Sequence, residues 1–517
     1  MEVTIDTGAL RGKVLQSRSG RNIAFFGGIP YAAPPIGELR WQAPQPPAAW
    51  EGVRDASEYG PSCPQLVVRG EGTFRDTIAR AIDYAIEERD WAQDEDCLCL
   101  NVFTPDVDSA TRRPVMVWVH GGAHRNGTSS AYPGEELAAK GVVLVTINYR
   151  LGPLGFLAHP ELTAEGCRGN QGLLDTVAAL QWVQRNIRRF GGDPGNVTVF
   201  GESAGGHSTC AMVTSPLCEG LIHRAIAQSG VGAQATMLLD RPGANPISAE
   251  QAGVKLGEAM GCPAGPGQLA AMRQLTAGEI IERTAAVPLP GVIIDGYCQV
   301  ENPVTAFRKD NQNPVDLMIG SNAFEGSALY WGAPMAQMRI CRDTETYLAE
   351  INRVFAEDAE EALLLYPASD EAEMVHSSKR MCGDSLFGAP TRAVVQALSE
   401  QDRPAWAYYF THTPDGDDGK LGAFHAMEIS YVFGVDFLSP LKSDADKALS
   451  ERMMNYWVNF ATTGNPNGAG LPRWDRYDSN ADTMMNFGSK IGMARVALPR
   501  EYDLIMRAID RQLAAVE

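Results

Sequence analysis

The stretch Asn196-Val-Thr-Val-Phe-Gly-Glu-Ser-Ala-Gly-Gly206 decides the fold of this chain. Its first five residues, Asn196 to Phe200, are mostly apolar and rich in β-formers, as a buried strand should be. A Gly-x-Ser-x-Gly turn follows, and a helix-compatible segment begins after Gly205. This order of strand, turn and helix is typical of a nucleophile elbow, in which small neighbours make room for a strained serine. We therefore predict that Ser203 is a nucleophile, with a glycine-serine turn of no catalytic role as the alternative.

Strand-like and helix-like segments alternate on both sides of this stretch. The apolar pattern predicts strands at 114–119, 141–147, 223–228, 315–320 and 406–411, and a helix over 173–190. Such alternation favours an α/β fold with a large, mostly parallel central sheet flanked by helices. No linker divides the chain, so we expect one domain over 1–517 with cap or lid insertions around 64–92, 231–290 and 333–400.

The composition excludes several classes of partner. Lys and Arg number 44 and Asp and Glu 63, so the net charge is 44 − 63 = −19. This charge argues against binding nucleic acid or anionic membranes. No apolar run approaches the roughly 18 residues that a membrane span needs, and the ten cysteines lack the spacing of zinc ligands. We therefore expect no metal, no cofactor and no membrane span.

The start of the chain shows no secretion signal. Met1 to Gly20 lacks a basic region followed by an apolar one. We expect a cytoplasmic protein, or a secreted or periplasmic one if a signal was removed.

A glycine-rich turn follows the 114–119 segment. His120-Gly-Gly-Ala123 lets the backbone approach a substrate oxygen and offer N–H groups to it. The other donor in such sites is the N–H of the residue after the nucleophile. We assign the oxyanion hole to Gly122, Ala123 and Ala204, with a simple glycine turn as the alternative.

The serine needs a base and an acid that follow it in the order serine, acid, histidine. His425 lies in a loop after the 406–411 segment, with His412 as its nearest rival, whereas His207 lies too close to Ser203 to reach back. Glu325 follows the 315–320 segment and fits the acid, with Asp295 as the alternative.

Six further segments carry a family resemblance. The chain resembles type-B carboxylesterases, which include cholinesterases and bacterial p-nitrobenzyl esterases, at Phe26–Gly37, Glu95–Val102, Asn148–Phe156, Gly169–Asp175, Val199–Gly206 and Asn459–Pro466. The resemblance implies an α/β-hydrolase fold and a serine carboxylesterase that forms an acyl-enzyme. It implies the triad Ser203, Glu325 and His425, a small-molecule ester as partner, and no cofactor. We expect a monomer or homodimer.

The resemblance also implies supporting residues. Glu202 would lie at the base of the gorge and Ser229 behind the triad. The remaining implied pairs are a disulfide, Cys63–Cys97, and two ion pairs, Arg40–Glu95 and Arg150–Asp175.

Three departures from the family pattern bear on the substrate. His124 stands where phenylalanine is usual and Arg125 follows it, so we predict a cationic pocket for an ester that carries a carboxylate; alternatively, Arg125 points to solvent or pairs with an acid. The 65–90 loop has no tryptophan for a quaternary ammonium, which argues against choline esters. Ala426 replaces the commoner glycine after the histidine.

Two questions stay open at this point. Phe74, Ile78, Ile82 and Ile86 recur every four residues and predict an amphipathic helix, either a lid or a packed surface helix. Rival functions are a non-catalytic adhesion or scaffold protein on this fold, and a lipase or amidase that uses the same triad.

Overall fold

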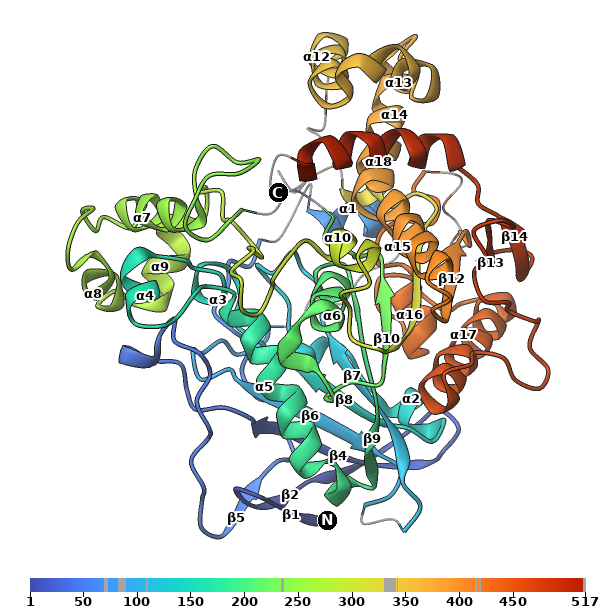
Figure 1. Cartoon of the computed structure of the whole chain (residues 1–517). Helices are drawn as coiled ribbons and strands as arrows, with labels where there is room; N and C mark the ends of the chain where they lie inside the picture. Colours follow the sequence, from blue (N-terminus) through green and yellow to red (C-terminus); the bar gives the residue numbers. More distant parts are fainter. Residues whose placement is uncertain are drawn as a thin grey trace.

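A large mixed sheet forms the centre of the molecule. The computed structural model describes residues 1–68, 73–81, 90–107, 110–233, 237–329, 341, 343–413, 417 and 420–514. Across these ranges, eleven strands form one sheet in the order β14-β13-β12-β11-β10-β9-β7-β8-β6-β4-β3 (Figure 1). Neighbours from β13 to β8 pair in parallel, and antiparallel pairs flank them at both ends. The predicted α/β fold with a mostly parallel sheet is confirmed.

The strands have the following bounds: β1 (Glu2–Ile5), β2 (Gly8–Arg11), β3 (Lys13–Gln16), β4 (Asn22–Pro30), β5 (Val53–Asp55), β6 (Cys99–Thr104), β7 (Arg113–Val119), β8 (Val143–Ile147), β9 (Gly192–Glu202), β10 (Arg224–Gln228), β11 (Asp316–Asn322), β12 (Ala405–Phe410), β13 (Thr483–Phe487) and β14 (Gly492–Arg495). Strands β1, β2 and β5 form a separate small sheet near the amino terminus.

The helices have the following bounds: α1 (Phe74–Ala81), α2 (Glu135–Ala139), α3 (Gly152–Gly155), α4 (Pro160–Ala164), α5 (Gln171–Asn186), α6 (Ala204–Thr214), α7 (Ala249–Ala259), α8 (Gln268–Arg273), α9 (Ala277–Thr284), α10 (Pro303–Arg308), α11 (Gly326–Leu329), α12 (Thr344–Phe355), α13 (Ala359–Leu365), α14 (Glu371–Gly383), α15 (Ala389–Glu400), α16 (Glu428–Phe433), α17 (Asp444–Thr463) and α18 (Pro499–Ala514).

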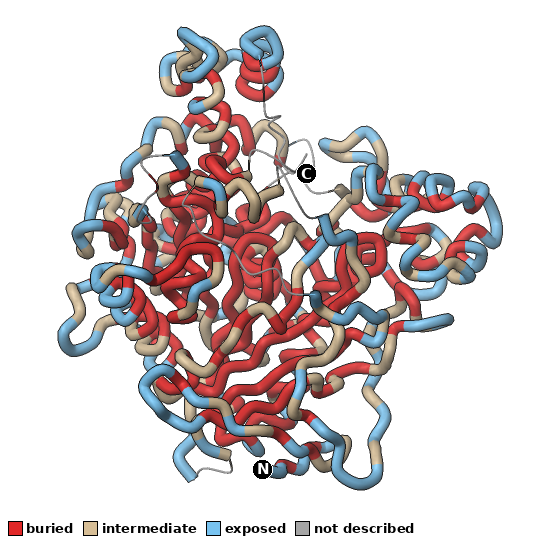
Figure 2. The backbone as a smooth tube through the Cα atoms, turned by 180° about the vertical axis from the view of Figure 1, so that it is seen from behind, coloured by how far each residue is buried: buried red, intermediate tan, exposed pale blue. Residues whose placement is uncertain are grey.

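The central strands are buried on both faces. In β7, Val115 and Val117 belong to one apolar cluster, while Met116 and Trp118 belong to the cluster on the other face. Burying a side chain of this size contributes about 1.5–3 kcal/mol, and parallel strands covered on both faces need continuous apolar runs. Figure 2 shows this buried backbone running through the middle of the molecule.

Every predicted strand is present, with shifted ends. His223 lies outside β10, and β9 begins four residues before Asn196. The predicted helix over 173–190 is α5 followed by a 3₁₀ turn, Ile187–Phe190. Strand ends depend on pairing with neighbours, which local apolar patterns do not report.

Helices cover the faces of the sheet and extend beyond it. Helix α6 packs on β9 and β10, and α15 packs on β11 and β12. Figure 1 shows α7, α8 and α9 grouped beside α4, and α12 and α13 projecting at the top. Helices α7, α8 and α9 fall in the predicted insertion 231–290, and α12 and α13 fall in the predicted insertion 333–400. The role of both insertions as caps stays a prediction.

The predicted amphipathic helix is described over its first half. Phe74 begins α1, and Ile78 is its buried residue. Ile82 and Ile86 lie outside the described residues. Helix α1 contacts α11, which begins directly after Glu325, so this segment lies near the predicted site.

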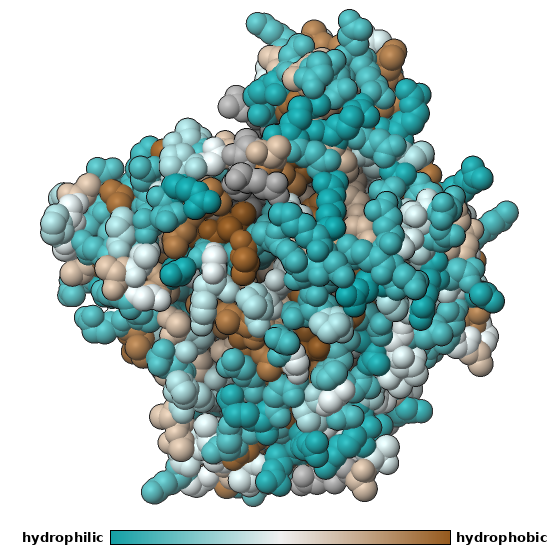
Figure 3. Space-filling model, viewed as in Figure 1, coloured by the Kyte–Doolittle hydropathy of each residue, from teal (hydrophilic) through white to brown (hydrophobic). Residues whose placement is uncertain are grey.

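The surface is mostly hydrophilic on the face that Figure 3 shows, with small apolar patches. Among the described residues, no helix is both long enough and apolar enough to span a bilayer.

Candidate active site

The predicted site residues lie where three parallel strands end. Strand β9 ends at Glu202, β10 at Gln228 and β11 at Asn322, and these strands are neighbours in the sheet. Residues that follow the carboxyl ends of parallel strands meet at one edge, where α/β folds bind their ligands.

The turn after β9 holds Ser203 in a strained conformation. Its backbone angles are φ 58° and ψ −121°, outside the regions that residues with a Cβ prefer. A Cβ on Gly205 would lie 1.9 Å from the carbonyl oxygen of Val119, and one on Gly201 would lie 2.5 Å from the backbone of Gly205. The glycines are therefore required by close backbone packing, as the elbow prediction supposed.

The structure brings His425 and Glu325 together. His425 Nδ1 lies 2.6 Å from Glu325 Oε2, and both side chains are buried. The other carboxylate oxygen, Oε1, accepts hydrogen bonds from Ser229 Oγ at 2.5 Å and from the backbone N–H of Asn322 at 2.7 Å. Glu325 is thus held on three sides and can orient the imidazole. Ser229 lies where the resemblance implied.

The far nitrogen of His425 faces a second carboxylate. Nε2 lies 3.1 Å from Glu202 Oε1, without the geometry of a hydrogen bond. In the described parts of the chain, no hydrogen bond joins Ser203 to His425. Such bonds are often long before substrate binds and tighten only in the complex.

Burial and neighbouring charge control the protonation of this cluster. Burial lowers the pKa of His425, but the carboxylates of Glu202 and Glu325 outweigh it and raise the pKa to about 9. Burial raises the pKa of Glu202 well above its usual range, opposed by His425. The two groups therefore titrate as a pair, and their protons cannot be assigned to one residue alone.

A third buried carboxylate, Glu428, lies at the start of α16. Asn322 Nδ2 donates to its Oε2 at 2.6 Å and Gln228 Nε2 to its Oε1 at 3.1 Å. Burial, together with the charge of Glu325, raises its pKa to about 7. Sequence reasoning did not assign Glu428 a role, although it closes the loop segment that carries His425.

Sequence reasoning also missed the aromatic neighbour of His425. The ring of Phe387 stacks on the imidazole with centroids 4.6 Å apart and an interplanar angle of 18°. Phe387 lies in a π-helical turn, Asp384–Gly388, between α14 and α15. Such turns often occur at functional sites, but helical periodicity in the sequence does not reveal them.

The predicted oxyanion turn lies against the elbow. A Cβ on Gly121 would lie 2.8 Å from the carbonyl oxygen of Glu202 and 3.1 Å from the Cβ of Ser203. Within the described residues, no hydrogen bond uses the backbone N–H of Gly122 or Ala123. Ala204 is the first residue of α6, so its N–H has no partner within the helix. All three N–H groups are available to an oxyanion.

The structure corrects the predicted cationic pair. His124 is buried, with its Nε2 2.9 Å from Ser208 Oγ. Burial, with His207 and His120 nearby, lowers its pKa well below the usual value, so this imidazole is neutral. Arg125 is largely exposed, partial burial of its guanidinium lowers its pKa, and no acidic side chain of the described residues pairs with it. Of the predicted cationic pair, Arg125 is therefore the member that carries a positive charge.

The rival residues lie in other networks. His412 bonds Asp446 at 2.7 Å. Asp295 Oδ1 accepts from the backbone N–H groups of Tyr297, Cys298 and Gln299 and organises its own loop. His207 packs against Gly232. Its backbone N–H donates to the carbonyl of Ser203 at 2.9 Å, and among the described residues neither His412 nor Asp295 is hydrogen-bonded to Ser203.

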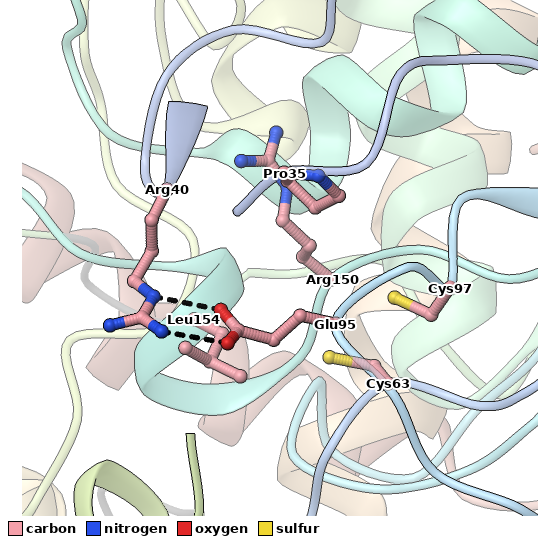
Figure 4. A pocket seen from close by; sticks show the side chains of 7 residues that line it. All are labelled: Pro35, Arg40, Cys63, Glu95, Cys97, Arg150 and Leu154. Carbon is pink, nitrogen blue, oxygen red and sulfur yellow. Dashed lines mark hydrogen bonds and ion pairs between the residues drawn. The ribbon is translucent and has the colours of Figure 1, made fainter. Parts of the chain in front are cut away.

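Figure 4 shows several of the predicted supports, Arg40, Glu95, Arg150, Cys63 and Cys97, lining one small pocket. Arg40 pairs with Glu95 at 2.7 Å, and Arg150 pairs with Asp175 at 2.7 Å, so both predicted ion pairs are confirmed. Cys63 and Cys97 are free thiols in the structure and not the predicted disulfide. The neighbouring Cys63 side chain and burial raise the pKa of Cys97. Their oxidation stays a prediction.

Metal ligands do not gather at this site. In the ranges that the structure describes, no group of three or more His, Cys, Asp or Glu could hold a metal ion.

Comparison with known proteins identifies the family. The model of the Carboxylesterase family matches residues 1–504 of this chain. A fumonisin B1 esterase of Sphingopyxis macrogoltabida is 36% identical over 495 residues, covering 91% of this chain and 84% of that protein. A medium-chain fatty acyl-CoA hydrolase precursor of Anas platyrhynchos is 35% identical, covering 92% and 87%. Carboxylesterase 1D of Rattus norvegicus is 33% identical, covering 93% and 87%. This chain therefore belongs to the carboxylesterase family and is a carboxylic ester hydrolase.

Proposed function

We propose that this chain hydrolyses carboxylic esters through an acyl-enzyme formed on Ser203. The observation that carries the proposal is the 2.6 Å contact between His425 Nδ1 and Glu325 Oε2. This contact lies at the edge of the sheet where the parallel strands end, and Ser203 lies there in the turn between β9 and α6. Glu325 fixes the imidazole so that Nε2 is the nitrogen that takes a proton.

The reaction runs in two halves. His425 Nε2 takes the proton of the Ser203 hydroxyl as the oxygen attacks the ester carbonyl carbon. The N–H groups of Gly122, Ala123 and Ala204 stabilise the oxyanion; each such donor is worth about 10²–10³ in rate. The carbon–oxygen bond to the alcohol breaks, and the alcohol leaves with the proton from His425. Water then repeats the attack on the acyl-enzyme and frees the acid and Ser203.

The test is the initial rate of p-nitrophenyl butyrate hydrolysis by the wild type and Ser203→Ala. Ser19→Ala, at an exposed turn, is the matched control. We expect the control to keep full activity and Ser203→Ala to fall to background with an unchanged melting temperature. Equal activity of Ser203→Ala and wild type would show that another group is the nucleophile.

We further propose that the enzyme favours esters that carry a carboxylate, through Arg125 alone. Arg125 follows the oxyanion turn, is exposed, and has no acidic partner among the described residues. A guanidinium binds a carboxylate through two parallel N–H bonds, and packing that lowers its pKa increases the gain from a counter-charge.

The test compares kcat/KM for p-nitrophenyl butyrate and for the p-nitrophenyl monoester of succinic acid. We expect Arg125→Gln to lose about 5- to 30-fold on the acidic ester, as expected for a charge-assisted bond of ~1–2 kcal/mol, and to keep its rate on the neutral ester. Arg125→Lys retains the charge and serves as the control. Equal losses on both esters would contradict a role in carboxylate binding.

A further inference from the structure

The oxyanion turn contains two successive residues in an unfavourable conformation. Ala123 has φ 58° and His124 has φ 56°, both in the left-handed region. This region costs a residue with a Cβ about 1–2 kcal/mol, and such strain persists only where the surroundings impose it. The turn that offers two of the proposed oxyanion donors must therefore be held from outside.

Backbone hydrogen bonds supply part of this restraint. The N–H groups of Arg125 and Asn126 both donate to the carbonyl of Gly122 at 3.0 Å, and Gly152 N–H donates to the carbonyl of His124 at 2.6 Å. These bonds close the turn on itself and fix it to the start of α3. None of them connects the turn to α6, which carries the third donor, Ala204.

The side chain of His124 makes that connection. Its Nε2 lies 2.9 Å from the hydroxyl of Ser208. Ser208 lies one helical turn after Ala204 in α6. The ring of His124 is thus bonded to the helical turn that follows the donor residue Ala204 in α6.

The surroundings of this ring make the link rigid. His124 is 6% exposed and Ser208 1% exposed. The imidazole packs against Phe156, with centroids 4.9 Å apart, and against His207 at 5.5 Å. A hydrogen bond that water cannot reach is stronger than an exposed one, and breaking it leaves a buried polar atom without a partner.

We propose that His124 is a positioning residue of the oxyanion hole, whose bond to Ser208 holds the donors of Gly122 and Ala123 at a fixed distance from the donor of Ala204. The inference rests on the proposed serine mechanism. The ring touches neither Ser203 nor the reacting atoms; it acts by keeping the two donor sets convergent, and stabilisation of an oxyanion depends steeply on that geometry.

The test is a double-mutant cycle of His124→Phe and Ser208→Ala. For each variant, kcat and KM are measured with p-nitrophenyl butyrate, and the inhibition constant is measured for an alkyl trifluoromethyl ketone, whose adduct with serine carries an oxyanion. Thr209→Val is the matched control, because Thr209 is also buried in α6 and bonds only within the helix, to the carbonyl of Gly205.

We expect each single variant to lower kcat about tenfold or more, less than the ~10²–10³ of losing a donor outright, with KM changed by less than about threefold. Affinity for the ketone should fall in the same proportion as kcat. The double variant should be little worse than either single variant, since both remove one link. His124→Gln, which can still bond Ser208, should recover part of kcat, and Thr209→Val should match the wild type.

Unchanged kcat and ketone affinity in Ser208→Ala would overturn the proposal, and this small change also decides the matter if His124→Phe fails to fold. Losses that simply add in the double variant would also overturn it, because they would show two independent effects. Failure of the serine mechanism has a separate signature, which is that Ser203→Ala stays active.

Discussion

Replacing Glu202 by glutamine tests how charge in the buried cluster controls the catalytic base. His425 acts as a base only when its imidazole is neutral, and the Glu202 carboxylate, 3.1 Å from Nε2, stabilises the protonated form. Glu202→Gln removes that charge at nearly constant volume. The pKa of His425 must therefore fall, and the enzyme must stay active at lower pH.

The size of the effect follows from the contact. At an effective dielectric constant of about 20, two charges 3.1 Å apart attract by about 5 kcal/mol, which is an upper limit for a fully ionised pair. Burial raises the pKa of Glu202, so the carboxyl is partly protonated and much of this attraction is absent. We expect the acid limb of the profile to move by about one pH unit, or ~1.4 kcal/mol.

The assay is kcat/KM for p-nitrophenyl butyrate against pH, since this quantity reports the free enzyme. For the wild type, activity should rise as pH increases toward about 9, the pKa of His425. In Glu202→Gln, the acid limb of the profile should lie at lower pH than in the wild type. Glu428→Gln is the control: its carboxylate is the weakest of the contributors to the pKa of His425, so the limb should move less. An unmoved limb, or one displaced to higher pH, would refute this reasoning.

Three further changes have defined outcomes. Phe387→Leu removes the ring stacked on His425; because an aromatic pair is worth about 0.5–1.5 kcal/mol, kcat should fall roughly 2- to 12-fold, and an unchanged kcat would show that the stack is incidental. Ala426 has φ 66°, so Ala426→Gly should raise the free energy of unfolding by about 1 kcal/mol, measured in urea; a lower midpoint would contradict the strain. Arg150→Met leaves Asp175 buried and uncompensated and should lower the free energy of unfolding by about 3–5 kcal/mol, whereas the exposed Arg473→Met should be neutral.

The sequence predicted those features that local spacing controls. The elbow could be read from one strand, one turn and one helix, because steric limits at Ser203 require glycine at Gly201 and Gly205. The positions of His425 and Glu325 followed from their place after strands, since parallel strands end at one edge.

Features that depend on burial could not be read in this way. His124 looks like a cation in the sequence, but packing against Phe156 and His207 keeps it neutral. Phe387 precedes His425 by 425 − 387 = 38 residues and lies in a π-helical turn, and its ring stacks on the imidazole in the folded chain. Side-chain environment arises from contacts between distant segments, which a single sequence does not contain.

The charge of the site relates the buried carboxylates to the two residues that follow the oxyanion turn, His124 and Arg125. Glu202, Glu325 and Glu428 surround one imidazole, and all three carboxylates are buried. Three buried negative charges beside one cation are unfavourable, which agrees with the raised pKa values of Glu202 and Glu428. Because His124 is neutral, it can hold the oxyanion turn without disturbing that balance, and Arg125, exposed at the rim, is left as the group that can meet a negative substrate.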